Sequence, residues 1–308
     1  MQHQYKEYIS NFREWEYDNP LSSSYFVNDQ NIGEYLSMDE TCLSQGELYT
    51  IVTNKAAKGK KGSLVAMIKG TKSEYIIHVL KENLSTIKRL SVKEITIDLS
   101  PTMKRISEYV FPKADIVSDR FHVQKLMNEA ISDLRVDHRW EAIDMENKEI
   151  QLAKENNQKF VPSTFRNGDT RRQLLARSRH IVMKHHSKWT YGQRKRAEIL
   201  FEQYPDIEEA YEISTELTNI YNSTNNKAIG LTKLAKWYDK VELLNSKFFN
   251  SVINTMKNNY QTIINYFNRR ATNAGAESFN AKVKAFRSQF RGVRDIPFFI
   301  FRLNKIFG

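Results

Sequence analysis

Cysteine is almost absent from this sequence, since Cys42 is the single one among 308 residues. One cysteine cannot form an intramolecular disulfide or a cysteine-rich zinc site. No apolar run reaches the ~18 residues that a membrane span requires, and the charged, aromatic N-terminus has no signal-peptide core. These absences argue against a disulfide-stapled secreted domain and a membrane protein, so we expect a cytoplasmic protein in a reducing compartment.

Acidic residues are outnumbered by basic ones, with 36 aspartates and glutamates against 47 lysines and arginines and a formal net charge of +11. This excess favours a polyanionic partner, nucleic acid before a membrane surface. A merely basic soluble protein would have the same charge, so composition alone does not decide between them. Apolar and aromatic contents of 40% and 12% indicate a folded chain of one large domain or two smaller ones.

Residues 93–122 have the pattern of a strand, a helix and a second strand. The first strand alternates apolar and polar side chains and ends at Asp98. Ser100 can cap the following helix, and the second strand ends at Asp119, shortly before His122. Open α/β sheets bind their ligands at the carboxyl ends of their strands. We therefore predict that Asp98 binds a metal ion that takes part in the cleavage of nucleic acid.

Three short strands precede this unit, at residues 35–39, 48–53 and 63–69, with short connections typical of an antiparallel meander. Ser73 is expected to cap a helix, and the apolar face of this helix is expected to extend to Ile87. The resulting order is strand, strand, strand, helix, strand, helix, strand. This order predicts a ribonuclease-H-like core, in which the first and fourth strands lie side by side.

The first of these strands carries Asp39, followed directly by Glu40, and the fourth ends at Asp98. Neighbouring strands would bring Asp39 and Asp98 close together, and two close carboxylates repel each other unless cations lie between them. Oxygen ligands without cysteine favour Mg²⁺ or Mn²⁺ over zinc. The alternative is that both are ordinary surface aspartates at strand ends.

The stretch of residues 166–196 contains ten lysines and arginines against one acid, Asp169. Trp189 and Tyr191 lie among them, a combination that suits a phosphate backbone with stacking on exposed bases. A solvated helix face is the alternative. The residues of this stretch that we expect to bind DNA are Arg171, Arg172, Arg177, Arg179, Lys184, Lys188, Arg194, Lys195 and Arg196.

A last helix is predicted from residue 274 onward, with Thr272 or Asn273 as its cap. One face is apolar. Another face carries a single acid near the helix start and then an amide and cations at steps of three or four residues: Glu277, Asn280, Lys284, Arg287 and Arg291. This row fits a metal ligand beside a DNA-binding track, whereas a surface helix with scattered charge is the alternative.

Three blocks together resemble the DDE transposases of bacterial insertion sequences, closest to the ISL-three group: residues 97–101 (IDLSP), 116–122 (IVSDRFH) and 272–280 (TNAGAESFN). The resemblance implies an α/β fold in which a ribonuclease-H-like core, a mixed five-stranded sheet with helices, is interrupted by a long helical insertion. The implied parts are an N-terminal helix and arm (1–34), the first part of the core (35–123), a basic insertion (124–268), and the glutamate helix with the C-terminus (269–308).

The resemblance further implies that Asp39, Asp98 and Glu277 are the catalytic triad and ligands of two Mg²⁺ or Mn²⁺ ions. One ion would be bridged by Asp39 and Asp98 and the other held by Asp39 and Glu277, for two-metal phosphoryl transfer. Whether Asp39 or Glu40 is the first acid stays open. Asp119 resembles the start of an Asp-x-x-His motif ending at His122, an accessory near the site.

The implied activity is metal-dependent cleavage of double-stranded DNA and transfer of its 3′-hydroxyl from transposon ends to a target, by a homodimer in the bacterial nucleoid. Longer family members carry an N-terminal zinc-binding segment and a helix-turn-helix that are not seen in this sequence. We therefore expect either a separate end-recognition protein or a truncated copy. The alternatives are a non-catalytic DNA-binding transposase remnant and a structure-specific nuclease that cuts without joining.

Overall fold

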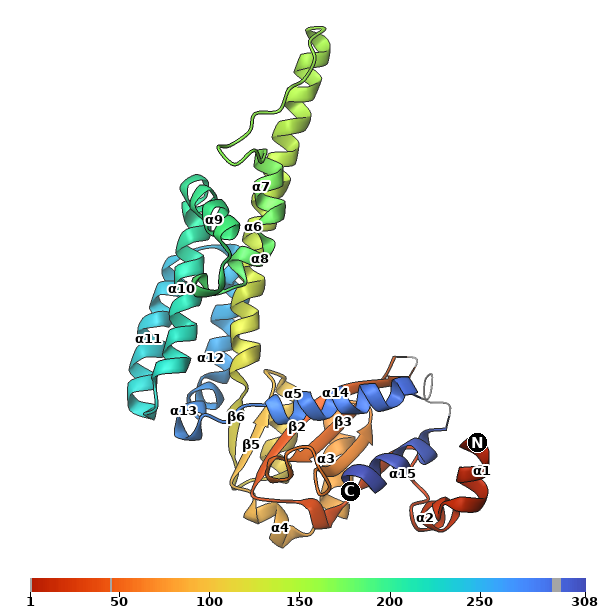
Figure 1. Ribbon diagram of the computed structural model, residues 1–308. Coiled ribbons are helices and arrows are strands. Elements are labelled where there is room, and N and C mark those ends of the chain that lie inside the picture. The colour runs from red at the N-terminus through yellow and green to blue at the C-terminus, as the bar shows by residue number, and fades with distance from the viewer. Residues whose placement is uncertain (1, 45, 290–294) are drawn as a thin grey trace. The chain divides into compact units, whose positions relative to one another are not determined.

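The computed structural model describes residues 2–44, 46–289 and 295–308 (Figure 1). They form two compact units. The sheet unit comprises the described residues of Met1–Arg120 and Gln261–Gly308, and the helical unit comprises Phe121–Tyr260. The α/β class expected from the sequence is confirmed.

The described residues of the sheet unit form a mixed six-stranded sheet in the order β1-β4-β3-β2-β5-β6. Its strands are β1 (Tyr25–Val27), β2 (Tyr35–Ser44), β3 (Glu47–Asn54), β4 (Leu64–Lys69), β5 (Glu94–Ile97) and β6 (Asp115–Ser118). Strands β2, β3 and β4 pair antiparallel as expected from the meander, and β1 is antiparallel to β4, whereas β5 is parallel to both β2 and β6.

The predicted number of five strands is wrong, because β1 adds a sixth at the edge. Its residues pair with β4 from Tyr25 opposite Ile68 to Val27 opposite Ala66. A free edge of β4 would present unpaired backbone groups, and this short strand from the predicted arm covers it. Three residues are too few for an alternating pattern to be recognised in the sequence.

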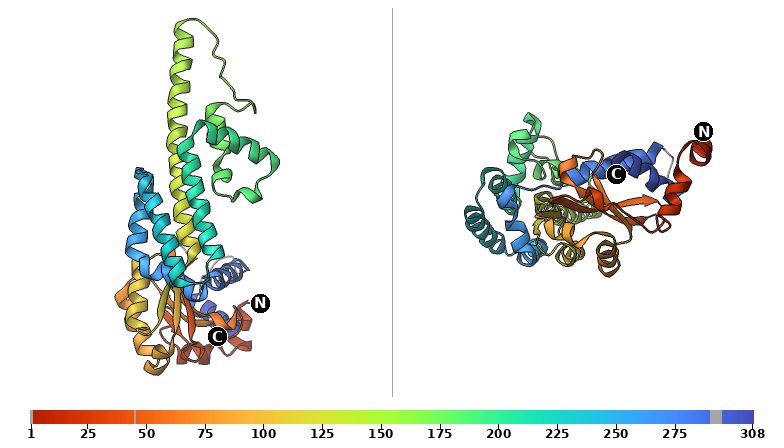
Figure 2. Two further views of the ribbon diagram at one scale, coloured as in Figure 1. Left: turned by 90° about the vertical axis from the view of Figure 1, so that its left-hand side faces the viewer. Right: turned by 90° about the horizontal axis from the view of Figure 1, so that it is seen from below.

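Helices cover both faces of the sheet (Figure 2). The helical segments of this unit are α1 (Gln2–Gln4), a π-turn (Tyr5–Ile9), α2 (Phe12–Asp18), α3 (Ser73–Asn83), α4 (Thr86–Ser91), α5 (Pro101–Val110), α13 (Tyr266–Arg269), α14 (Ala274–Gln289) and α15 (Ile296–Phe307), with 3₁₀ turns at Asp29–Asn31 and Lys55–Ala57. Helices α3 and α5 pack on one face through a buried cluster that includes Leu36, Ile95 and Ile97. Because Ile95 and Ile97 point into this core, Thr96 and Asp98 point to the opposite face, as the alternation predicts.

Helices α14 and α15 cover that opposite face. Phe279 and Val283 of α14 pack with Ile51 and Met67 of the sheet, and Phe299 of α15 joins the same cluster. The apolar face predicted for α14 is thereby confirmed for its described residues, while Phe290 lies outside them. The face of the sheet toward which Asp98 is predicted to point is therefore the face that α14 covers.

The helix from Ser73 ends earlier than predicted. Leu84 follows the end of α3, and Ser85 caps a separate helix, α4, by accepting a hydrogen bond from the backbone N–H of Lys88. Ile87 lies on α4 and is 84% exposed, so its assignment to the apolar face was wrong. The capping serine explains the break, because its side chain satisfies a backbone donor at a new helix start.

The helical unit is built around α6, a helix of 36 residues. Its segments are α6 (Arg120–Glu155, beginning one residue before the unit), α7 (Arg171–Arg177), α8 (Arg179–Val182), α9 (Tyr191–Gln203), α10 (Pro205–Ser223), α11 (Lys227–Leu243) and α12 (Asn250–Ile264, ending in the sheet unit), with 3₁₀ turns at His186–Lys188 and Lys247–Phe249. Trp237 of α11 is fully buried, and its indole N–H donates to the carbonyl of Ile213 in α10 at 2.7 Å. The sequence predicted mostly helical structure after His122, and the helices of this unit confirm it.

Candidate active site at the carboxyl ends of the strands

Asp39 and Asp98 lie on neighbouring strands of the sheet unit. The parallel pairing of β2 with β5 sets Ser37 opposite Thr96. Asp39 follows two residues later within β2, and Asp98 directly follows the last residue of β5, so both acids lie at the same end of neighbouring strands. Burial raises the pKa of the Glu40 carboxyl, and the negative charges of Asp98 and Asp39 raise it further. The three acids are therefore close enough to interact at one edge of the sheet.

Backbone and side-chain donors hold the two aspartates. Asp98 Oδ1 accepts a hydrogen bond from the backbone N–H of Ser100 at 2.8 Å, at the start of α5. Asp39 Oδ1 accepts from the backbone N–H of Glu40 at 2.8 Å, and Asp39 Oδ2 accepts from Asn280 Nδ2 at 2.6 Å. Asn280 thus joins α14 to the strand that carries Asp39. The sequence grouped Asn280 with DNA-contacting cations, whereas its side chain is buried and faces this acid.

Glu277 lies in the first turn of α14, three residues before Asn280 and hence on a similar face of the helix. The helix starts at the predicted place, because the backbone N–H of Glu277 donates to the carbonyl of Asn273 at 3.0 Å. Asn273 itself is fully buried, and neither of its side-chain polar atoms has a hydrogen-bond partner among the described residues. It marks the helix start without capping it through its side chain.

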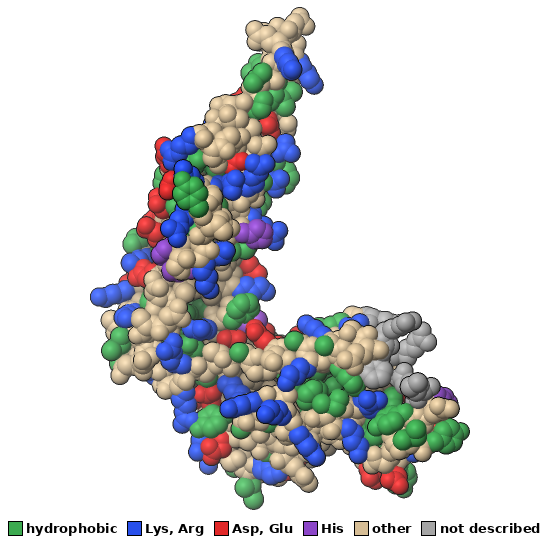
Figure 3. Space-filling model, in the orientation of Figure 1, with side chains coloured by type: hydrophobic (Ala, Val, Ile, Leu, Met, Phe, Trp, Pro, Cys, Tyr) green, Lys and Arg blue, Asp and Glu red, His purple; other side chains and the backbone are tan. Residues whose placement is uncertain are grey.

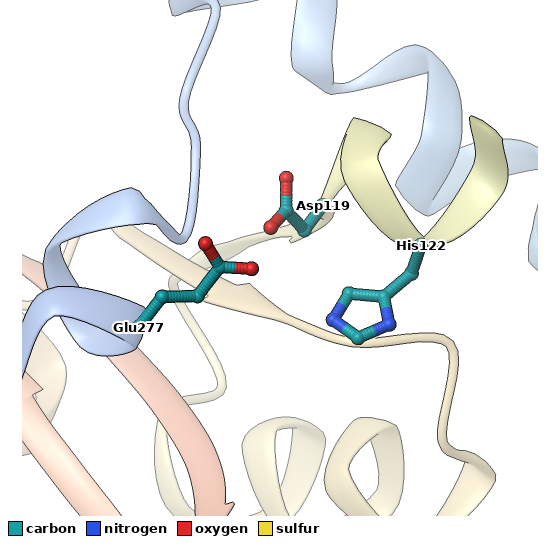
Figure 4. A group of neighbouring side chains, drawn as sticks. All are labelled: Asp119, His122 and Glu277. Carbon is teal, nitrogen blue, oxygen red and sulfur yellow. The ribbon is translucent and has the colours of Figure 1, made fainter. Parts of the chain in front are cut away.

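Asp119 follows β6, where its backbone N–H donates to the carbonyl of Ile97 at 2.8 Å, and it is 2% exposed. Figure 4 shows its carboxylate with that of Glu277 and the imidazole of His122. One ligand atom from each lies within 4.8 Å of the others, the one such group of three found among the described residues. Asp39 and Asp98 are not part of it. The sequence motif indicated an accessory role for Asp119, and its closeness to Glu277 was not foreseen.

The donors at this edge suit a hard divalent cation. Carboxylate oxygens predominate, with one imidazole nitrogen and no thiol, and this set is typical of Mg²⁺ or Mn²⁺. Neither Asp98 nor Glu40 forms an ion pair with a described residue. Carboxylates that lie close together repel one another, and a cation between them would stabilise them. The residues therefore fit a metal site.

The basic residues expected to bind DNA divide into paired and unpaired ones. Asp169, 1% exposed at its side chain, pairs with both Arg177 and Arg196, at 2.8 Å to the latter. Arg172 pairs with Glu146 at 3.2 Å. Those without an ion pair to any described residue are Arg171, Arg179, Lys184, Lys188, Arg194 and Lys195 in the helical unit, and Lys284 and Arg287 on α14; Arg291 lies outside the described residues. Figure 3 shows lysines and arginines on one face, with acidic side chains among them.

The two aromatic residues of the basic stretch have different surroundings. Trp189 stacks on Tyr211 with ring centroids 5.3 Å apart, contacts Phe201, and donates from its indole N–H to the carbonyl of Ile181 at 3.1 Å. Tyr191 is 73% exposed, and Lys195 Nζ lies 4.8 Å from its ring centre. Trp189 therefore serves the packing of the helical unit, and Tyr191 is the solvent-exposed one of the two rings.

The sheet, its acidic edge and its basic helices define an α/β protein with a carboxylate site suited to a divalent cation. The model of the DDE transposase family of the ISL-three group, described as transposase, matches residues 36–303. The chain belongs to this family, which confirms the resemblance found in the sequence and assigns the chain to DNA transposition in general. Members of the family typically use divalent metals. A comparison with curated proteins gives no match, and no described helix is both long and apolar enough to span a membrane.

Proposed function

We propose that this protein is a transposase that cleaves DNA strands and joins a free 3′-hydroxyl to target DNA in a metal-dependent reaction. The observation that carries the proposal is that the parallel strands β2 and β5 bring Asp39, in β2, and Asp98, directly after β5, to the same end of the sheet, where Asn280 of the helix that bears Glu277 binds Asp39. These three acids are the proposed catalytic residues. The strand order β4-β3-β2-β5-β6, antiparallel and then parallel, supports a ribonuclease-H-like core interrupted by an insertion at about residues 124–268.

Asp39, Asp98 and Glu277 would hold the two metal ions. When bound, such ions polarise a phosphoryl oxygen and lower the pKa of a coordinated water. The chain itself orients the ligands: backbone N–H groups fix Asp98 and Asp39, and Asn280 holds the second oxygen of Asp39. Asp119, beside Glu277, is the proposed accessory acid together with His122.

Double-stranded DNA is the proposed substrate, as both transposon ends and target. Lys284 and Arg287 continue along α14 from the acidic site, and their charges would bind phosphates next to the reacting one. A homodimer would bring two ends together, and a separate protein would recognise the terminal sequences.

A strand-transfer assay tests the proposal. Purified protein is incubated with labelled DNA taken from both flanks of its coding sequence, and with a target plasmid, with and without Mg²⁺ or Mn²⁺. Metal-dependent cleavage followed by joining to the plasmid is the expected result. Cleavage that never yields joined product would instead identify a nuclease. DNA binding with neither reaction would identify a non-catalytic remnant.

Removing the amide that holds Asp39 is expected to weaken metal binding. Asn280→Ala deletes the 2.6 Å hydrogen bond to Asp39 Oδ2 without touching a proposed ligand. Loss of such an outer partner typically lowers metal affinity roughly tenfold or more. Calorimetric titration with Mn²⁺ measures the change, and Asn268→Ala, at an exposed asparagine of α13, is the matched control. Equal affinities in the wild type and both variants would show that Asn280 does not position the site.

The unpaired cations of the helical unit are expected to provide sequence-independent DNA affinity. Replacing Lys184, Lys188, Arg194 and Lys195 together by glutamine should flatten the dependence of log affinity on log salt by up to about 0.9 for each phosphate that the variant no longer neutralises. Arg166, paired with Glu202 at 2.9 Å, and Arg172 supply the control substitutions. Fluorescence anisotropy at several salt concentrations gives both slopes. An unchanged slope in the fourfold variant would exclude these residues from DNA binding.

A further inference from the structure

The helical unit contains a buried arginine without an acidic partner. Arg135, in α6, is 4% exposed. Its Nη1 donates to the carbonyl of Leu175 at 2.7 Å and its Nη2 to Ser132 Oγ at 3.5 Å, while its Nε has no partner among the described residues. A buried charge is costly unless it is paired. No acidic side chain among the described residues therefore balances the positive charge of Arg135.

Two further arginines of the helical unit increase this imbalance. Burial lowers the pKa of the Arg135 guanidinium, and the positive charges of Arg139 and Arg179 lower it further. Arg139 follows one helical turn later in α6, and its Nε is also buried without a described partner. Arg179 begins α8. Arg179 follows four residues after Leu175, whose carbonyl Arg135 binds. No ion pair joins Arg135, Arg139 or Arg179 to a carboxylate among the described residues.

A structural role explains part of this arrangement. Leu175 lies in the last turn of α7, so Arg135 caps a carbonyl at that helix end, where a cation is favourable. Capping uses one of the five N–H donors of Arg135 and does not require Arg139 or Arg179. The exposure of the three side chains increases from buried through half-buried to exposed. The three arginines thus extend from the buried Arg135 to the solvent-exposed Arg179.

We propose that Arg135, Arg139 and Arg179 form a binding site for a phosphate group. Planar guanidinium groups bind phosphate oxygens through paired, charge-assisted hydrogen bonds, and an anion here would compensate all three charges at once. The phosphate group is either a backbone phosphate of DNA or a free inorganic phosphate. The site belongs wholly to the helical unit and does not depend on the acidic residues of the proposed catalytic site.

Thermal unfolding with inorganic phosphate tests whether the site exists. Phosphate is compared with chloride at equal ionic strength for the wild type, for Arg139→Gln and Arg179→Gln, and for the control Arg166→Gln, an exposed arginine paired with Glu202. The wild type and the control should be stabilised by phosphate, since a ligand that binds only the folded state raises its stability. The two site variants should bind phosphate roughly tenfold more weakly. Equal phosphate responses in all four proteins would overturn the proposal.

DNA titrations of the same proteins identify the source of the phosphate. A backbone phosphate predicts weaker DNA binding by each site variant than by Arg166→Gln, with a salt slope reduced by about one. A diminished phosphate response with control-like DNA binding would support the site and assign it to free phosphate. Arg139 and Arg179 are chosen because the side chain of neither makes a hydrogen bond to another described residue, so the helical unit should fold in both variants.

Discussion

Asp98→Asn is expected to reduce metal-dependent DNA cleavage and joining by about 1,000-fold, because the loss of an anionic ligand removes several kcal/mol of transition-state stabilisation. The amide has nearly the shape of the acid. Its oxygen can still accept the hydrogen bond from the backbone N–H of Ser100, so the start of α5 should be preserved. DNA affinity should remain close to that of the wild type, since the substitution removes no cation.

The matched control for this variant is Asp115→Asn. Asp115 is an exposed aspartate at the first residue of β6, the opposite end of that strand from Asp119. It should keep full activity and full metal binding. Calorimetry with Mn²⁺ in the presence of DNA separates the two proteins: the ion assigned to Asp39 and Asp98 should no longer bind to Asp98→Asn, whereas Asp115→Asn should bind metal as the wild type does. Continued cleavage and joining by Asp98→Asn would show that the active-site assignment is wrong.

Local patterns in the sequence predicted the edge of the sheet that carries the acids. The alternation around Ile97 placed Asp98 opposite the core, and the strand order placed it beside Asp39. Ser100 caps α5 as expected, accepting from the backbone N–H of Met103, with Pro101 in the first turn. Each of these features depends on residues close in sequence or on the order of elements, which a single sequence displays.

Interactions between distant residues were not predictable in the same way. The bond from Asn280 to Asp39 joins residues 241 positions apart, and it depends on how α14 is seated on the sheet. The seating also brings Glu277 to Asp119. Helical spacing shows which residues share a face of α14, but it does not show which strand that face meets.

The charge of the basic stretch was overestimated for a related reason. Counting within residues 166–196 gives one acid, Asp169, yet Glu146 and Glu202 from outside this stretch also pair with its arginines. Asp169 is shared by two arginines. A window of sequence counts charges but does not include the partners that the fold brings from elsewhere.

Asp169→Asn is expected to destabilise the helical unit by about 3 kcal/mol, because breaking a buried ion pair leaves its partners without compensation. The carboxylate of Asp169 is almost fully buried and accepts hydrogen bonds from Arg177 of α7 and Arg196 of α9, which it links. Asn167 Nδ2 donates to it as well, at 2.8 Å. Denaturant-dependent hydrogen exchange would resolve the loss in α7 and α9 from the stability of the sheet unit.

Asp144→Asn is the control for this substitution, since Asp144 is an exposed residue of α6 without an ion pair to any described residue. The free energy of unfolding of Asp144→Asn should differ from that of the wild type by less than about 0.5 kcal/mol, as is usual for surface substitutions. If Asp169→Asn were as stable as this control, the two arginines would not depend on Asp169 for their placement.

The same ion pairs give the helical unit a defined dependence on pH. Burial alone would raise the pKa of Asp169, but the hydrogen bonds and charges of Arg196 and Arg177 outweigh it, so the pKa lies below its ordinary value. A carboxyl group whose pKa is lower in the folded state than in the unfolded state stabilises the fold when the pH is above its unfolded pKa. For aspartate the unfolded pKa is about 3.9. This stabilisation is lost as the pH falls through the pKa of the folded state. The stability difference between the wild type and Asp169→Asn should therefore be full at pH 7 and shrink below about pH 4. Other carboxyl groups titrate in both proteins and cancel in the difference, so a gap that stayed constant down to about pH 2 would contradict the assigned role of Asp169.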